Sequence, residues 1–395
     1  MIVGVPKESY PGERRVALAP SAIAHLAKGG MQVVVEAGAG ALAGYPDAEY
    51  AAKGAKVVAQ RAEVFGAADI VAQVLCYGSN DLTGAADLPL MRPNQTLVGF
   101  LRPFGSREIL QEIASRNVTS FAVELMPRTT RAQSMDALSS MGTICGYKAV
   151  LIAADTLPRM FPMLTTAAGT IVPSRVFIIG AGVAGLQAIA TARRLGAQVS
   201  AYDVRPAVKE QVQSLGARFV DLPLETKDAE DAGGYARAQD ENFYRKQREV
   251  LTRVVAESEV VITAAVIPGK KSPVLITEDM VKGMGPGSVI VDLAAERGGN
   301  CELTRAGEDV VAHGVTVMGR FNLASTVPYH ASQLYSRNVS AFLLHVVKDG
   351  QVRLAEDEII RDTLVTHGGE IVHRRVREFF ALPVPAAQAP GGPSQ

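Results

Sequence analysis

A glycine-rich turn is the pattern in this sequence whose chemistry can be read most directly. Gly180, Gly182 and Gly185 follow the apolar run 176–179 and open an apolar helix that ends near Gly196. In such a pattern the first glycine allows a tight turn, the second lets the backbone approach a pyrophosphate, and the third lets the helix pack close to the strand. The free N–H groups and partial positive charge of a helix N-terminus favour phosphate groups.

An acidic residue stands at the end of the next predicted strand, 198–202. Asp203 has the spacing, about 20 residues after the glycines, at which a carboxylate binds the hydroxyls of an adenosine ribose. A carboxylate repels the 2′-phosphate of NADP, so Asp203 favours NAD, although the nearby Arg205 leaves that preference open. The turn and Asp203 together predict a dinucleotide site. The alternative is a glycine-rich turn in an ordinary α/β sheet.

A second group of polar side chains lies in the segment 127–140, beside an expected domain junction. Asp136 and Ser139 are three positions apart, so they share one face on a helix. Arg128 and Gln133 stand on the loop that leads into this helix. Because clefts form at domain junctions, the four side chains predict a ligand site. The alternative is a capped helix with a surface ion pair.

Short strands and helices alternate along the chain, which predicts parallel, doubly wound sheets. Strands are expected at 2–5, 32–36, 56–58, 70–74, 96–101, 119–123, 176–179, 198–202, 218–220, 260–263, 288–293 and 315–318. Helices are expected at 21–28, 47–53, 61–65, 106–115, 208–215, 243–257, 277–282 and 331–348. A longer helix is expected to be capped by Ser134 and to run to about Leu157.

The predicted fold class is α/β, with two Rossmann-like doubly wound parallel-sheet domains separated by a cleft. The first domain is expected to be discontinuous, 1–133 plus 325–380, because the helix at 331–348 is expected to pack back on it. The NAD-binding Rossmann domain is expected over 134–324. The Pro/Ala/Gly-rich tail 381–395 is expected to be disordered.

Composition narrows the functional classes. The chain has 395 residues, 48% of them hydrophobic, and a formal net charge of zero, which suits a compact protein. No basic block occurs and aromatic residues make up 6%, so nucleic acid is not an expected partner. Three distant cysteines lack metal-ligand spacing, so no metal site is expected. No apolar run reaches the roughly 18–20 residues that span a bilayer, so the protein is expected in the cytoplasm unless a partner holds it at a membrane.

The polar segment 225–242 cannot bury much surface and is expected to be a mobile loop. Tyr235, next to Gly234, could close over a ligand, or it could belong to an ordinary turn. Small residues after the strand 260–263, including Ala265, leave room for a cofactor.

General acid–base residues are not evident near the predicted site. Dehydrogenases that act on a carbinol or an amine need a proton acceptor near the nicotinamide. None of the six histidines stands at a strand end in a predicted cleft, with His330 the one doubtful case. Hydride exchange between two nicotinamides needs no such group, because no proton leaves the reacting carbons. Such a protein must only bring two rings together and exclude water.

Several segments resemble the alanine dehydrogenase and proton-pumping transhydrogenase group. The shared segments are PKE…ERRVALAP at 6–20, GAGVAGLQAIATARRLGA at 180–197 and VDLAAERGGN at 291–300. PRTTRAQSMDALSS at 127–140, GGYA at 233–236 and IPGKKSPVLIT at 267–277 are similar to the transhydrogenase branch, in its NAD(H)-binding α-subunit component. The likeness covers about residues 1–348.

The resemblance implies a homodimer that binds NAD(H) and docks on an NADP(H)-binding component and on a membrane-spanning component. It implies direct hydride transfer between the two nicotinamides, coupled to proton translocation. It also implies a peripheral location on the inner face of the membrane, with the membrane helices on another polypeptide.

The resemblance also assigns roles to residues of this chain. Arg128, Asp136 and Ser139 would hold the nicotinamide carboxamide, and Gln133, the expected catalytic residue, would reach the partner's nucleotide. The complete expected NAD(H) site is Arg128, Gln133, Asp136, Ser139, Gly180, Gly182, Val183, Ala184, Gly185, Asp203, Val204, Arg205, Gly234, Tyr235, Gln247, Ala265 and Val266. Position 266 is usually leucine in the family.

Two other functions stay open at this point. An amino-acid dehydrogenase of the alanine dehydrogenase type would keep Arg15 as a carboxylate anchor. That branch, however, uses a histidine where this chain has Arg102, and a lysine in a segment that matches 73–76, which contains none. A catalytically silent NAD-sensing module is the third possibility.

Overall fold

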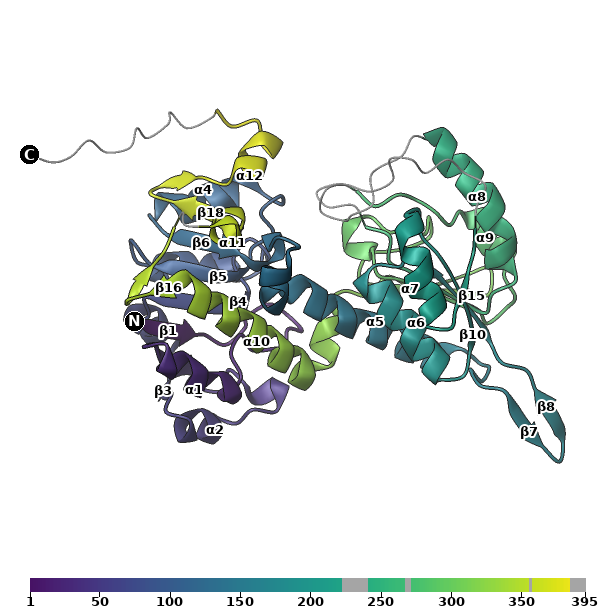
Figure 1. Cartoon of the computed structure of the whole chain (residues 1–395), viewed down its shortest axis with the longest axis horizontal. Coiled ribbons are helices and arrows are strands. Elements are labelled where there is room, and N and C mark those ends of the chain that lie inside the picture. The colour runs from purple at the N-terminus through teal and green to yellow at the C-terminus, as the bar shows by residue number, and fades with distance from the viewer. Residues whose placement is uncertain (222–240, 267–270, 355–356, 384–395) are drawn as a thin grey trace, which may run out of the picture. The chain divides into compact units, whose positions relative to one another are not determined.

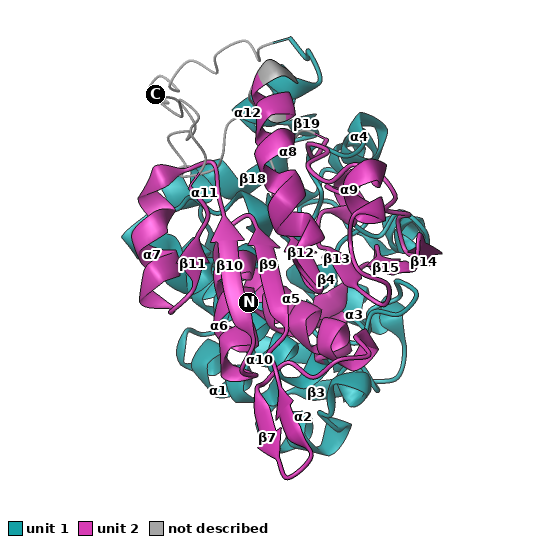
Figure 2. Cartoon of the chain, turned by 90° about the vertical axis from the view of Figure 1, so that its right-hand side faces the viewer, with its two compact units in different colours: residues 1–140, 328–395 teal, residues 141–327 magenta. Residues whose placement is uncertain are grey.

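The computed structural model describes residues 1–221, 241–266, 271–354 and 357–383. The chain forms two compact units, Met1–Ser140 with Pro328–Gln395 and Met141–Val327 (Figure 2). Each unit contains its own large sheet, so the confirmed fold class is α/β with Rossmann-like architecture. The expected strands of both sheets occur to within one residue at either end.

Unit 1 contains a sheet whose described strands have the order β19-β18-β6-β5-β4-β1-β2-β3 (Figure 1). The strands are β1 Ile2–Val5, β2 Gln32–Glu36, β3 Lys56–Val58, β4 Ile70–Leu75, β5 Thr96–Phe100, β6 Thr119–Ala122, β18 Leu364–His367 and β19 Glu370–Ile371. β1 to β6 pair in parallel, and β18 pairs antiparallel with both β6 and β19. The helices of this unit are α1 Pro20–Lys28, α2 Asp47–Ala52, α3 Arg61–Ala67, α4 Arg107–Ser115, α10 Pro328–Val346, α11 Glu358–Thr363 and α12 Arg374–Phe379.

The strand expected at 315–318 is β15, the last strand of unit 2 along the chain, but the strands that follow it in unit 1 were not expected. β16 Val347–Lys348 and β17 Gln351–Val352 form a small hairpin, and β18 and β19 extend the large sheet. These strands have two to four residues, too few for a clear alternation of apolar and polar positions. A signal was present in Gly368-Gly369, which join β18 to β19 with φ angles of 58° and 84°.

Unit 2 contains a sheet whose described strands have the order β11-β10-β9-β12-β13-β15-β14 (Figure 2). The strands are β9 Arg175–Ile179, β10 Gln198–Tyr202, β11 Arg218–Phe219, β12 Val260–Thr263, β13 Val289–Asp292, β14 Asp309–Ala312 and β15 Val315–Met318. The helices are α6 Val183–Arg194, α7 Lys209–Ser214, α8 Glu241–Ala256 and α9 Glu278–Lys282. Strand order reverses between β9 and β12, which is the point where open α/β sheets bind dinucleotides.

The long helix α5, Ala137–Thr156, starts later than the sequence predicts. Ser134 does not cap it, because Ser134 lies in the 3₁₀ helix η4, Thr130–Met135. The cap is Asp136, whose Oδ1 accepts a hydrogen bond from the backbone N–H of Ser139 at 2.8 Å. An aspartate at this position satisfies one of the free N–H groups of the first turn. Asp136 and Ser139 therefore do not share a helical face, because Asp136 precedes the helix.

α5 is also long and apolar enough to cross a membrane, with a hydropathy of 1.3 over its most apolar stretch. The sequence-based expectation counted only uninterrupted apolar runs, and it did not single out this helix because Lys148 and Asp155 interrupt its apolar residues. Within unit 2 the helix contributes Ala149, Val150 and Ala153 to the core beneath β9. This packing is what a core helix of an α/β unit shows.

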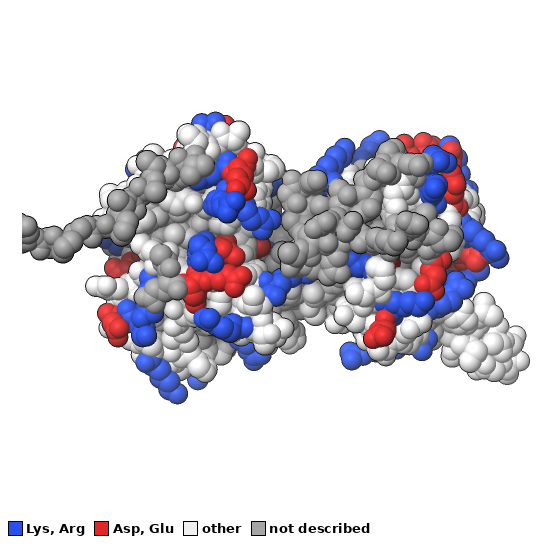
Figure 3. Space-filling view, turned by 45° about the horizontal axis from the view of Figure 1, so that its top comes forward, with Lys and Arg blue, Asp and Glu red and all other residues white. Residues whose placement is uncertain are grey.

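A two-stranded hairpin, β7 Leu164–Thr166 and β8 Gly169–Ile171, extends from unit 2 (Figure 1). Every residue of these strands is exposed. The segment 160–173 contains no charged residue, and Figure 3 shows the hairpin as a white surface. Met163 and Val172 beside the strands are 64% and 76% exposed. A two-stranded hairpin on its own is only marginally stable in water. Packing against the rest of its own chain therefore contributes little to the stability of this hairpin.

Candidate functional site

The glycine turn between β9 and α6 has the geometry of a phosphate-binding loop. Gly180 has a φ of 97°, and a Cβ added there would lie 2.9 Å from the backbone of Ala264 and Ala265. A Cβ on Gly185 would lie 1.8 Å from the carbonyl oxygen of Gly180. A Cβ on Gly182 would meet no described atom within 4 Å, so this glycine borders open space. Gly182 precedes the first turn of α6, which no described side chain caps. The cradle therefore fits a pyrophosphate.

Asp203 follows β10 and braces the same turn. Its Oδ2 accepts a hydrogen bond from the backbone N–H of Ala181 at 2.8 Å. Arg205 donates from Nε to Oδ1 and from Nη2 to Oδ2, each at 2.9 Å. The Asp203 side chain is 5% exposed and that of Arg205 is 12% exposed. The acid is therefore paired, and a ribose that binds it would join or replace these contacts.

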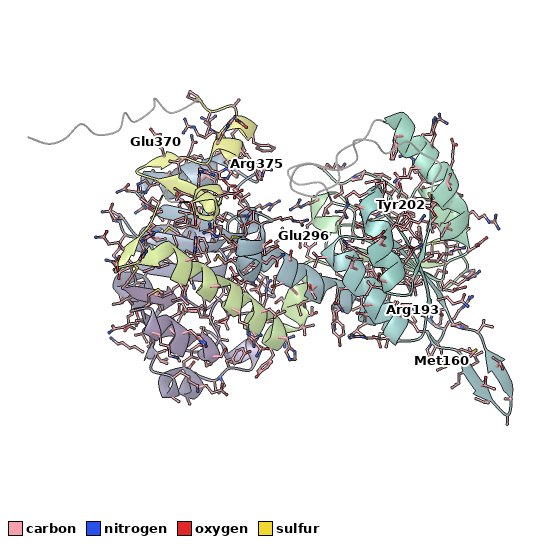
Figure 4. All side chains as sticks on the ribbon, viewed as in Figure 1. Met160, Arg193, Tyr202, Glu296, Glu370 and Arg375 are labelled. Atoms are coloured by element: carbon pink, nitrogen blue, oxygen red, sulfur yellow. The ribbon has the colours of Figure 1, made fainter. Side chains whose placement is uncertain are left out.

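Gln247 of α8 offers a buried acceptor near the same strand. Its Nε2 donates a hydrogen bond of 2.9 Å to the hydroxyl of Tyr202, the last residue of β10 (Figure 4). Its Oε1 is buried and has no hydrogen-bond partner among the described residues. A buried acceptor without a partner costs roughly 1–3 kcal/mol, so a donor from a bound ligand would be stabilising there. The hydroxyl and amino groups of an adenosine are such donors.

The remaining expected residues of unit 2 lie at the ends of the same elements. Val183 and Ala184 are in the first turn of α6, Val204 follows Asp203, and Ala265 and Val266 follow β12. Gly234 and Tyr235, with residues 225–240 of the expected loop, lie outside the described residues, whereas 241–242 belong to α8. The structure thus groups the glycine turn, Asp203, Gln247 and Ala265 around the carboxyl ends of β9, β10 and β12.

The second group of expected residues lies in unit 1, in the segment 128–139, which contains η4 and the start of α5. The Ser139 hydroxyl donates a hydrogen bond of 2.5 Å to Oδ2 of Asp136. Both side chains are partly buried, whereas Arg128 and Gln133 are exposed. The Ser134 carbonyl accepts a hydrogen bond of 2.9 Å from the Asn338 amide of α10, which fixes η4. This arrangement leaves the polar side chains on a held, accessible loop.

Gly146 is a structural residue that the sequence analysis missed. A Cβ at this position of α5 would lie 2.0 Å from the carbonyl oxygen of Ala184, in the first turn of α6. The glycine therefore lets α5 pack against the phosphate-binding turn. The signal was the pair Gly142 and Gly146, a spacing that lets helix backbones approach closely.

Arg15 does not present a free charge at the carboxyl end of β1. Its Nε and Nη2 donate hydrogen bonds of 2.8 and 2.6 Å to the two carboxylate oxygens of Glu13. The Arg15 side chain is 4% exposed and that of Glu13 is 0% exposed. Nearby, Glu8 accepts hydrogen bonds from the backbone N–H groups of Val74 and Leu75, and burial raises its pKa to about 8.

The described histidine, cysteine and acidic side chains are not arranged for metal binding or for thiol chemistry. Within the described ranges no group of three His, Cys, Asp or Glu residues is arranged to hold a metal ion. Burial raises the pKa of the Cys301 thiol to about 11, and that of Cys76 well above its ordinary value. His313 and His345 each pair with a carboxylate, on Glu278 and Asp357.

A Rossmann sheet with a glycine turn and an acid after its second strand is typical of a dinucleotide-binding protein. The family description "Alanine dehydrogenase/PNT, N-terminal domain" matches residues 4–145, and "Alanine dehydrogenase/PNT, C-terminal domain" matches residues 149–374. The chain belongs to the alanine dehydrogenase/PNT family.

Relatives place the chain with the transhydrogenases of this family. It is 46% identical over 377 residues to an NAD(P) transhydrogenase subunit alpha polypeptide of Rhodospirillum rubrum, covering 94% of this chain and 98% of that one. A crystal structure of a transhydrogenase from Sinorhizobium meliloti is 41% identical, with a TM-score of 0.82 over 95% of this chain and 100% of that one. An L-alanine dehydrogenase structure is 26% identical, with a TM-score of 0.81 over 96% and 99% of the two chains.

Proposed function

We propose that this chain is the NAD(H)-binding subunit of a proton-translocating NAD(P)⁺ transhydrogenase. It would bind NAD(H) and exchange a hydride directly with NADP(H) on a partner component. A membrane component would couple this exchange to proton translocation. The nicotinamide supplies the hydride chemistry when bound, and the residues of this chain bind it, orient it and leave it accessible.

The observation that carries this proposal is the pair formed by Asp136 and Ser139 at the start of α5. The hydroxyl of Ser139 donates to Asp136 at 2.5 Å, so one carboxylate and one hydroxyl form a fixed donor–acceptor group. A carboxamide has an NH2 donor, which the remaining lone pairs of this carboxylate and hydroxyl can accept, and a carbonyl oxygen, which needs a donor from another residue. With Arg128 on the same loop, this group would hold the nicotinamide carboxamide. Gln133, exposed on η4, would reach the partner's nucleotide.

The residues of unit 2 would hold the rest of the dinucleotide. The turn from Gly180 to Gly185 would cradle the pyrophosphate. Asp203 with Arg205 would bind the adenosine ribose, and the buried Oε1 of Gln247 would accept a hydrogen bond on the adenosine side.

The transhydrogenase reaction agrees better with unit 1 than amino-acid oxidation does. An amino-acid dehydrogenase needs a cationic anchor for the substrate carboxylate, and Arg15 is buried and bound to Glu13 through both carboxylate oxygens. Breaking such a buried pair is costly, roughly 3–5 kcal/mol when one partner is lost. Transhydrogenation needs neither this anchor nor a general base.

We further propose that the chain works as a homodimer, peripheral to the inner face of a membrane through its partner subunits. The uncharged β7–β8 hairpin supports the homodimer, because Leu164 and Ile171, which lie opposite each other on its two strands, are both exposed apolar residues. Apolar surface of this kind is covered at subunit interfaces.

The experiment that tests the function mixes the purified chain with an NADP(H)-binding component and NADPH, and follows reduction of an NAD analogue by absorbance. The proposal expects reduction that requires both proteins. No hydride exchange with an intact partner would overturn it. A parallel assay supplies alanine and NAD⁺ to the chain alone, and NADH formation there would favour the alanine dehydrogenase function.

A further inference from the structure

Asn300 has an unusual set of contacts in unit 2. Its side chain is buried, and its Oδ1 accepts a hydrogen bond of 3.1 Å from the backbone N–H of Ala265. Its Nδ2 donates hydrogen bonds of 2.9 Å to the carbonyl oxygens of Ala265 and Pro273. One amide therefore ties together the two chain segments on either side of residues 267–270. Only Asn or Gln carries an acceptor and two donors in this form.

The peptide that Asn300 holds lies directly against the phosphate-binding turn. A Cβ on Gly180 would be 2.9 Å from the carbonyl carbon of Ala264 and from the backbone nitrogen of Ala265. The backbone N–H of Ala264 also donates a hydrogen bond of 2.8 Å to the carbonyl oxygen of Ile179, at the end of β9. A displacement of the Ala265 peptide would therefore disturb the glycine turn.

Asn300 is in turn fixed by a buried carboxylate at the end of β13. Oδ2 of Asp292 accepts hydrogen bonds from the backbone N–H groups of Asn300 and Cys301, at 2.7 and 3.1 Å, and from the Thr304 hydroxyl at 2.6 Å. Its Oδ1 accepts from the Thr263 hydroxyl at 2.9 Å. A buried carboxylate with both oxygens satisfied holds its partners in one arrangement.

We propose that Asn300 is a positioning residue for the adenosine half of the dinucleotide. It keeps the Ala265 peptide in the one orientation that leaves the Gly180 turn undisturbed and the adenosine side open. This inference rests on the proposed function in that the bound dinucleotide is NAD(H). Asn300 does not touch the reacting atoms, so its effect is on nucleotide affinity and not on the hydride step.

The test replaces Asn300 by aspartate. Asn300→Asp keeps the acceptor for Ala265 and turns both donor contacts into contacts between oxygens, which are repulsive. NADH affinity is measured by fluorescence titration, and AMP affinity by competition. We expect both to weaken about tenfold or more and by the same factor, because the defect is confined to the adenosine side. The kcat at saturating NADH with the partner component stays within about twofold.

Gln95 of unit 1 provides a matched control. Its Nε2 is buried and also donates to two backbone carbonyl oxygens, those of Phe65 and Ala68, at 2.9 and 2.8 Å. Gln95→Glu makes the same chemical change far along the chain from the glycine turn. We expect it to lower the thermal unfolding temperature as Asn300→Asp does while both nucleotide affinities stay within twofold of wild type.

The possible results separate the inference from the proposed function. If the wild-type chain binds no NADH, the proposed function fails. If the wild type binds and folded Asn300→Asp binds equally well, or Gln95→Glu weakens binding as much, the positioning role is wrong. A loss of NADH affinity with unchanged AMP affinity also contradicts it. Should Asn300→Asp not fold, Asn300→Ser, which removes the contacts without adding charge, undergoes the same comparison with the same criteria.

Discussion

Asp203 and Arg205 form a two-pronged ion pair, with Nε and Nη2 of the arginine each 2.9 Å from one carboxylate oxygen. Asp203 also accepts a hydrogen bond from the backbone N–H of Ala181, inside the glycine turn. The residue that would select the nucleotide is thus also one that shapes the phosphate-binding turn. This double role makes its substitution informative.

Asp203→Ala should narrow the gap between NADH and NADPH affinity. The change removes the charge that repels a 2′-phosphate and releases Arg205 to bind one. We expect NADH to bind roughly tenfold more weakly, about 1.4 kcal/mol, and NADPH to bind more tightly. Fluorescence titration measures both. Glu259→Ala, which breaks the ion pair of Glu259 with Arg175 in the same unit, is the control that should leave the ratio unchanged. Unchanged affinities in Asp203→Ala would show that Asp203 does not select.

Asp136 should act both as a helix cap and as a ligand-binding group, and two variants separate these roles. Asp136→Asn keeps an acceptor for the Ser139 N–H, so we expect almost wild-type stability but weaker NADH binding. Asp136→Ala should also lose about 1 kcal/mol of stability with the cap. Thermal unfolding measures the change in stability, and NADH titration measures the change in binding. AMP affinity should change in neither variant, and a matching loss of AMP affinity would place the effect outside the nicotinamide.

Gly182→Ala and Gly185→Ala should fail in different ways. A Cβ on Gly185 would lie 1.8 Å from the Gly180 carbonyl oxygen, so this variant should lose both stability and NADH binding. A Cβ on Gly182 meets no described atom within 4 Å, so that variant should fold normally and lose affinity only because a methyl group enters the pyrophosphate space. Calorimetry and titration test this. Tight NADH binding by Gly182→Ala would mean that the pyrophosphate lies elsewhere.

Glu8 should make the protein less stable as the pH rises. Burial raises the pKa of this carboxyl from 4.5 to about 8, so the folded state favours the protonated form. The unfolded chain loses its proton near pH 4.5, and the contribution of Glu8 to stability is full below that pH. It is lost as the pH rises toward 8. Glu8→Gln should flatten this part of the stability profile, measured by denaturant unfolding at several pH values. An equal decline in wild type and variant would exclude Glu8 as the cause.

The β7–β8 hairpin should be required for the proposed homodimer. Ile171→Asp puts a charge on an uncharged strand, and we expect it to weaken self-association at least tenfold in analytical ultracentrifugation. Val311→Asp, on β14 where Val311 is 72% exposed, is a matched single substitution that should leave association unchanged. A wild-type chain that sediments as a monomer at high concentration would contradict the homodimer.

The sequence contained enough information for the central part of both sheets. Runs such as 176–179 and 260–263 are short, apolar and rich in β-branched residues, and local pattern decides their state. β18 and β19 could not be found in this way, since β18 pairs with β6, from which it is about 246 positions distant, and β19 pairs in turn with β18. The glycine turn was predictable because each glycine in its spacing has a known structural role.

The supporting contacts of the candidate site were much harder to foresee. Nothing local indicates that Asn300 would bind Ala265. The spacing of Gly142 and Gly146 indicates a close helix contact but not its partner Ala184, because that contact depends on how two elements pack. The cap of α5 is a smaller case of the same kind. Ser134 and Asp136 are both good caps, and the formation of η4 over Thr130–Met135 decided for Asp136.

The most direct test of the account follows the hydride itself. NADPH that carries deuterium at the transferable position of its nicotinamide is mixed with this chain, an NADP(H)-binding component and NAD⁺, and the NADH formed is analysed by mass spectrometry. The account predicts that the deuterium arrives in NADH without exchange with water. Deuterium lost to the solvent, or no labelled NADH at all with an intact partner, would contradict it.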